Sequence, residues 1–155
     1  GYTVEEFNQL TDWILERAPL SYIAIASWGQ NIYLNKVRAE GPNEGRLINE
    51  VVHEHLAGRV PLMATGGINS IEKSREAIIH AEMIGLSSVF VAEPDFVAKF
   101  RENREEDINL DVGVEDIERL AIPKAAFKDI VLMMDYGKSL PQHTRDEFRK
   151  LEENY

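Results

Sequence analysis

The segment VPLMATGGINS, residues 60–70, constrains the fold of this chain more than any other stretch. Its apolar start runs directly into Gly66 and Gly67, and Asn69 and Ser70 are residue types that begin helices. An apolar run, a glycine pair and a helical pattern predict a strand, a tight turn and a helix, the unit of parallel α/β sheets. Ligands of α/β folds bind outside the carboxyl ends of strands, where glycine lets the backbone approach a phosphate. The glycine pair therefore predicts either a phosphate site or only a close turn from strand to helix.

The same alternation of helix and strand extends over the first two thirds of the chain. Residues 21–27 and 60–64 are apolar runs of strand type, and periodicity favours a third strand at 86–91. Thr3 and Glu6 have the spacing of a capping box. Helices are expected at 3–18, 46–57, 71–83, 95–104, 114–120, 124–137 and 144–155, with a long loop at 28–45.

This order of elements predicts a parallel sheet with right-handed crossovers. A (β/α)₈ barrel takes about 250 residues, so three strands do not fill one. The chain is therefore expected to be either a small open α/β sheet or a piece of a barrel. Because it begins with Gly1 rather than methionine, we expect a processed product, a cloned fragment or the ordered part of something longer.

Composition excludes several classes of function. The chain has 27 acidic and 17 basic side chains and a formal net charge of −10, with no basic patch, so nucleic acid is not an expected partner. Cysteine is absent, which excludes disulfides and fits a reducing compartment. No apolar run approaches the ~20 residues of a membrane span, and no signal segment opens the chain. We therefore expect a cytoplasmic protein without a membrane partner.

Two apparent metal sites do not have the geometry of one. His53 and His55 are two residues apart on an expected helix, so their side chains point in different directions. Residues 107–118 have carboxylates at calcium-loop spacing, but Val112 occupies the position that needs glycine. Ile108 and Leu110 in this segment have the character of packing residues. No metal ligand is therefore assigned.

Three segments together resemble a known family. They are YIAIASWG at 22–29, RVPLMATGGINSIEKSREAI at 59–78 and IGLSSVFVAEPDFVAKF at 84–100. In order and spacing they are similar to the sixth, seventh and eighth β/α units of the Old Yellow Enzyme family, NADH:flavin oxidoreductases built on an FMN-binding TIM barrel. The resemblance covers about residues 1–105. It implies an α/β fold that is a partial (β/α)₈ TIM barrel, roughly the last three β/α units plus carboxyl-terminal helices.

The resemblance also implies a different position for the third strand. The family pattern places that strand at about 83–86 and makes residues 88–92 a short helix. We prefer this placement to the strand at 86–91 that periodicity favours.

The resemblance implies a site for the phosphate of FMN in the loops after the last two strands, which agrees with the usual phosphate site of such barrels. Gly66 and Gly67 would offer backbone N–H groups. Ser87 and Ser88 occupy the positions where the family usually has a Gly-Arg pair. Because the arginine is missing and hydroxyls give only neutral hydrogen bonds, affinity should fall unless another cation compensates.

The resemblance implies that the first five strands of the barrel are not in this chain, nor are the family's His/Asn or His/His pair that binds the substrate carbonyl and its proton-donating tyrosine. No catalytic residue is therefore assigned, and the isolated chain is expected to be inactive. The full-length protein would use FMN, NADH or NADPH, and a small-molecule substrate. Residues 1–105 would form the carboxyl-terminal half of the barrel, and residues 106–155 an acidic connector and a helical extension. Trp28 would lie in the core or border the flavin pocket.

Two alternatives remain open from the sequence. The chain could be a self-sufficient α/β module that binds a phosphorylated ligand or a protein partner without redox chemistry, or part of a different phosphate-binding barrel enzyme. A partial sheet exposes strand edges and an apolar face, so we also expect the isolated chain to self-associate through its sheet edges.

Overall fold

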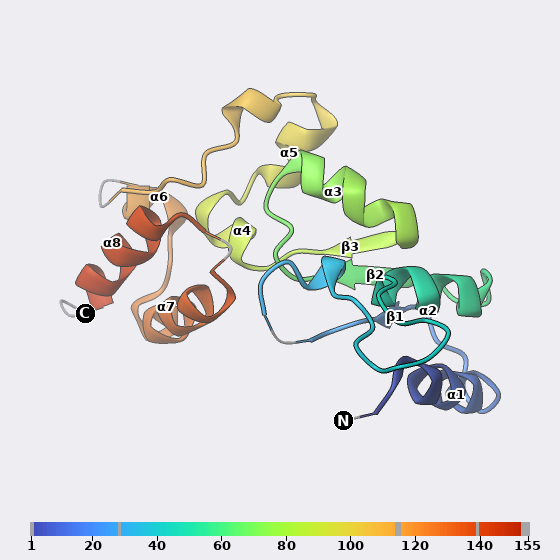
Figure 1. The fold of residues 1–155 in the computed structure, drawn as a ribbon. Coiled ribbons are helices and arrows are strands. Elements are labelled where there is room, and N and C mark those ends of the chain that lie inside the picture. Colours follow the sequence, from blue (N-terminus) through green and yellow to red (C-terminus); the bar gives the residue numbers. More distant parts are fainter. Residues whose placement is uncertain (1, 28, 114–115, 139, 153–155) are drawn as a thin grey trace. The chain divides into compact units, whose positions relative to one another are not determined.

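The computed structural model describes residues 2–27, 29–113, 116–138 and 140–152, and it has an α/β fold (Figure 1). The chain divides into two compact units. The first consists of residues 1–68 and 72–85, and the second of residues 69–71 and 86–155. The expected division of roles between residues 1–105 and 106–155 stays a prediction.

The first unit contains the strands and the helices that alternate with them. In chain order these elements are α1 (Val4–Leu15), β1 (Ile23–Ala24), the 3-10 helix η1 (Ile32–Leu34), α2 (Ile48–Leu56), β2 (Leu62–Thr65), most of α3 (Ile71–Ala77), the 3-10 helix η2 (Ile78–His80) and β3 (Met83–Gly85). The strands form one parallel sheet in the order β1–β2–β3 (Figure 1). The predicted parallel α/β sheet is thus confirmed.

The two faces of the sheet differ in burial. Leu62 and Ala64 in β2 are completely buried, whereas Met63, which points to the other face, is only half-buried. The parallel register places Met63 beside Ala24 and Met83, and both of these residues are exposed. The sheet therefore has one covered face and one open face.

The third strand lies at Met83–Gly85, as the family pattern placed it. The strand expected from periodicity at 86–91 is wrong, because α4 (Ser88–Ala92) covers most of that segment. Val89 and Ala92 are buried while Phe90 between them is exposed, which is helical spacing. A short apolar run alone does not distinguish a strand from a buried helix.

Several boundaries differ from expectation. The helix expected at 71–83 ends as α3 and η2 at His80, because Ala81 is extended (φ −164°) and leads into β3. The strand expected at 21–27 forms only the short ladder at Ile23–Ala24. Trp28 lies outside the described residues, so the prediction for it is not tested.

The histidines of α2 have separate partners. His53 Nε2 lies 2.8 Å from Glu82 Oε1, and His55 Nε2 lies 2.9 Å from Asp12 Oδ1. The prediction that the two side chains diverge is confirmed. The Leu62 N–H donates to Glu82 Oε2 at 2.7 Å, and this bond, with the bond to His53, lowers the pKa of Glu82. The ionised carboxylate therefore fixes the start of β2.

The second unit is helical. It contains α4, α5 (Phe96–Arg101), the 3-10 helix η3 (Glu105–Asp107), α6 (Ile117–Leu120), α7 (Lys124–Gly137) and α8 (Gln142–Glu152). Val112 is buried in a core with Met134 and Phe148. Ile108 and Leu110 pack against a second core cluster, which confirms their expected packing role.

Thr144 of α8 holds the connector that was considered as a calcium loop. Its hydroxyl donates to the Leu110 carbonyl at 2.8 Å and accepts from the Val112 N–H at 2.9 Å. Over the ranges that the structure describes, no helix is long and apolar enough to cross a membrane.

Candidate functional site

The glycine pair forms the turn at the carboxyl end of β2. Gly66 and Gly67 have φ angles of +86° and +82°, in the left-handed region that side chains disfavour. Two successive residues of this kind form a bend directly after Thr65, the last residue of the strand. The predicted strand and glycine turn are confirmed, and the turn lies at the end of a parallel strand where α/β folds bind ligands.

The loop that follows β1 packs closely on this turn. A Cβ on Gly66 would lie 2.5 Å from the Cβ of Ile32, and a Cβ on Gly67 would lie 2.7 Å from the Cα of Asn31. Asn31 itself has a left-handed backbone, with φ +51°. Glycine is therefore required at both positions for two reasons. The backbone has a positive φ, and Ile32 and Asn31 lie too close to leave room for a Cβ.

A lysine lies on the same turn. Lys73 Nζ, from the helix that follows the turn, donates to the Gly67 carbonyl at 3.3 Å and to Asn31 Oδ1 at 3.2 Å. The lysine is half-buried, so its charge is partly withdrawn from water. We call Asn31, Gly66, Gly67 and Lys73 the glycine-turn cluster; it places a cation and a tight backbone turn at one end of the sheet.

Tyr33 secures the loop that contacts the glycines. Its side chain is buried, and its hydroxyl donates to Glu76 Oε2 at 2.8 Å. Burial, followed by the Glu76 carboxylate, raises the pKa of Tyr33 above its ordinary value, so the hydroxyl stays protonated as a donor. This bond connects η1 to α3 and thereby fixes the position of Asn31 and Ile32.

The predicted serines belong to the second unit. Ser87 is exposed and has φ −135° and ψ −76° at the start of α4, and Ser88 is buried as the first residue of that helix. Gly66 and Gly67 belong to the first unit. The phosphate-binding role of all four residues stays a prediction.

The chemistry of the glycine-turn cluster fits a phosphate. Phosphate oxygens accept hydrogen bonds from backbone N–H groups in glycine turns and from lysine ammonium groups. The cluster supplies a glycine turn and the Lys73 ammonium, whereas the chain as a whole carries a charge of −10. A local cation therefore strengthens the binding of an anion here.

Sequence reasoning did not identify Asn31 or Lys73. The usable signal for Lys73 was a lysine six residues after the second glycine, within reach of the turn in the following helix. Asn31 had no such signal, because its place on Gly67 depends on how the loop after β1 folds back. Within the described ranges, no group of three or more His, Asp or Glu side chains is arranged to hold a metal ion.

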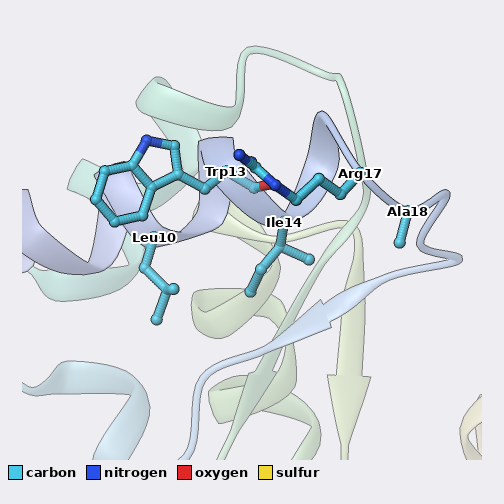
Figure 2. Close-up of a pocket in the computed structure, with 5 residues that line it drawn as sticks. All are labelled: Leu10, Trp13, Ile14, Arg17 and Ala18. Carbon is cyan, nitrogen blue, oxygen red and sulfur yellow. The ribbon is translucent and has the colours of Figure 1, made fainter.

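An apolar surface lies on α1, in the first unit. Leu10, Trp13 and Ile14 are 46%, 51% and 40% exposed, and with Arg17 and Ala18 they line an open hollow of about 360 Å³. Figure 2 shows Leu10 and Ile14 pointing the same way from the helix, as residues four apart do. The surface lacks convergent polar side chains apart from Arg17, so it has the character of an interaction surface rather than of a catalytic site.

Comparison with known proteins gives two relatives, and no protein-family model matches the chain. An uncharacterized oxidoreductase of Streptococcus pyogenes serotype M5 is 50% identical over 155 residues, which is all of this chain and 39% of that protein. A probable NADH-dependent flavin oxidoreductase of Bacillus subtilis, YqiG, is 25% identical over 132 residues, 84% of this chain and 34% of that protein. Both relatives carry the name oxidoreductase. The chain spans little more than a third of the length of either one.

Proposed function

We propose that this chain is the carboxyl-terminal part of an FMN-dependent NAD(P)H:flavin oxidoreductase of the Old Yellow Enzyme family. The observation that carries the proposal is the 50% identity, over the whole chain, to a longer protein named as an oxidoreductase. The more distant relative is named as an NADH-dependent flavin enzyme, which supports flavin and NADH as the cofactors. The absence of cysteine supports a cytoplasmic location.

The arrangement of the sheet supports the proposal that the chain is part of a (β/α)₈ barrel. Its strands are parallel and follow one another in chain order, as they do in such barrels. Parallel sheets are almost always covered on both faces, yet the face that carries Met63 and Met83 is open. We propose that the remaining β/α units of the full-length protein close this face, and that the present strands are the last three of the barrel.

In this proposal the chain supplies the loops that bind the phosphate of FMN. Gly66 and Gly67 would donate backbone N–H groups, and Ser87 and Ser88 would add hydroxyl or backbone donors. The turn geometry of the glycines and the cation beside them support this role. The bound flavin would carry the hydride chemistry, while these residues hold its phosphate and so fix its position.

No residue of the chain is proposed to be catalytic. The substrate-binding and proton-donating groups would come from the rest of the full-length protein, which would act on a small-molecule substrate. The isolated chain would then be inactive.

The close packing of Ile32 and Asn31 on the glycines gives the turn a structural reason as well. Glycines that the packing alone requires do not need a flavin phosphate to explain them, which favours the second candidate, a self-sufficient α/β module that binds a phosphorylated ligand or a protein partner without redox chemistry. The flavin content of the full-length protein, meaning the complete natural chain that contains residues 1–155, separates the two candidates.

The full-length protein is expected to be purified with bound FMN. Heat-released flavin should comigrate with FMN in chromatography, and anaerobic addition of NADH or NADPH should bleach the oxidised flavin band. A full-length protein that contains no flavin, and that gains none when FMN is supplied, would favour the binding module instead.

We also propose that the isolated chain self-associates through the exposed edges of its sheet and through the apolar surface of α1. Sedimentation velocity at increasing concentration should show species larger than 17.6 kDa. A Leu10→Gln, Ile14→Gln double variant should weaken association, because exposed apolar area drives it. Leu132→Gln on α7 is the matched control, since Leu132 is 69% exposed. A monomer at every concentration would contradict the proposal.

A further inference from the structure

The glycine-turn cluster points to a residue that replaces the missing arginine. We propose that Lys73 is the cation that binds the phosphate of the flavin. This inference rests on the proposed function, because it takes the phosphate to lie at Gly66 and Gly67. It assigns to Lys73 a binding role that the sequence alone did not give it.

The position of Lys73 is the first support. Its Nζ contacts the carbonyl of Gly67 itself, at 3.3 Å, so the ammonium already lies on the turn that would hold the phosphate. The Nζ also donates to Asn31 Oδ1 at 3.2 Å, and this second hydrogen bond helps to hold the lysine side chain at the turn. No large movement of the lysine is needed to reach a group bound at these glycines.

The chemistry of two hydrogen bonds that Lys73 makes, to Gly67 and to Asn31, is the second support. The Gly67 carbonyl and the Asn31 amide are neutral acceptors, and a hydrogen bond between charged groups is roughly twice as strong as one between neutral groups. A phosphate at the turn would therefore compete well with these acceptors for the ammonium. The half-buried setting of Lys73 strengthens that attraction, because water screens it less.

The charge of the chain is the third support. A phosphate dianion meets a net charge of −10 over the whole chain, and the serines at positions 87 and 88 bring no compensating charge. Lysine binds phosphate as a point charge, without the forked geometry of arginine. The ammonium of Lys73 supplies such a charge on the turn itself.

The test compares FMN with riboflavin, which lacks the phosphate, in the full-length protein after its flavin has been removed. Lys73→Met is expected to weaken FMN binding by about 10- to 100-fold, the loss of one charged hydrogen bond, and to leave riboflavin binding within about twofold. Lys73→Arg keeps the charge and should recover most of the loss. Lys36→Met is the matched control, because it removes an exposed lysine from the same unit.

The outcomes separate this inference from the function on which it rests. If wild-type protein prefers FMN and Lys73→Met preserves that preference, Lys73 is not the phosphate cation, although the proposed function stands. If the variant weakens FMN and riboflavin equally, Lys73 has a structural role and the inference is wrong. If wild-type protein binds neither flavin, or binds both equally, the proposed phosphate site fails and the role of Lys73 fails with it.

Discussion

Replacing Gly67 with alanine is expected to lower the free energy of unfolding of the chain by about 3 kcal/mol. The left-handed φ of +82° costs an alanine about 1–2 kcal/mol. The added Cβ would also meet the backbone N and Cα of Asn31, and relieving that overlap costs about 1–3 kcal/mol more. Urea unfolding followed by circular dichroism measures the loss.

Gly45→Ala is the matched control for this variant. Gly45 lies in the same unit and has a similar φ of +78°, but a Cβ there would meet nothing within 4 Å. It should lose only the backbone cost of about 1–2 kcal/mol. Equal losses in unfolding free energy at Gly45 and Gly67 would contradict the close packing of Asn31 on Gly67.

Replacing Lys99 with methionine is expected to cause the second large loss in the free energy of unfolding. Glu93 is a buried carboxylate, only 3% exposed, and its Oε2 accepts from Lys99 Nζ at 2.5 Å and from the Asn109 N–H at 3.2 Å. Lys99→Met would leave that carboxylate buried without its cation. Breaking a buried pair in this way destabilises by about 3–5 kcal/mol, which urea unfolding would detect.

An exposed ion pair of the second unit provides the comparison. Arg104 contacts Glu102 and Asp107, and all three side chains are more than 40% exposed. Arg104→Met should therefore cost less than about 1 kcal/mol. A loss at Lys99 no greater than the loss at Arg104 would contradict the view that the Glu93 carboxylate depends on the Lys99 ammonium.

Local sequence signals predicted much of the first unit. Thr3 and Glu6 form the expected capping box, with Glu6 N–H donating to Thr3 Oγ1 and Thr3 N–H donating to Glu6 Oε2. The glycine pair ended β2 because its backbone needs positive φ at both residues. Such features depend on neighbours in sequence, and they are therefore readable from it.

Features that depend on residues distant in the sequence could not be predicted from it. The apolar stripe of α1 is not buried as one face: Val4 is buried, Leu10 and Ile14 are exposed, and the polar Asn8 and Thr11 are buried instead. Periodicity shows that a helix has two faces, but it does not show which partner covers either one.

The same distinction between local and distant features applies to the candidate site. The sequence predicted the glycine turn and its place at the end of a strand. It did not predict that Asn31 and Lys73 meet at Gly67, because this contact joins a loop after β1 to the helix after β2. The ion pair of Glu93 was also missed, since burial of a carboxylate depends on the packing of the second unit.

The measurement that tests the central claim most directly is the affinity of the flavin-free full-length protein for FMN and for riboflavin, followed by quenching of flavin fluorescence. Charged hydrogen bonds to the phosphate contribute about 1.5–3 kcal/mol each, so FMN is expected to bind at least about 100-fold more tightly. Equal affinities, or no binding of either flavin, would contradict the claim that this chain supplies the phosphate site of an FMN enzyme.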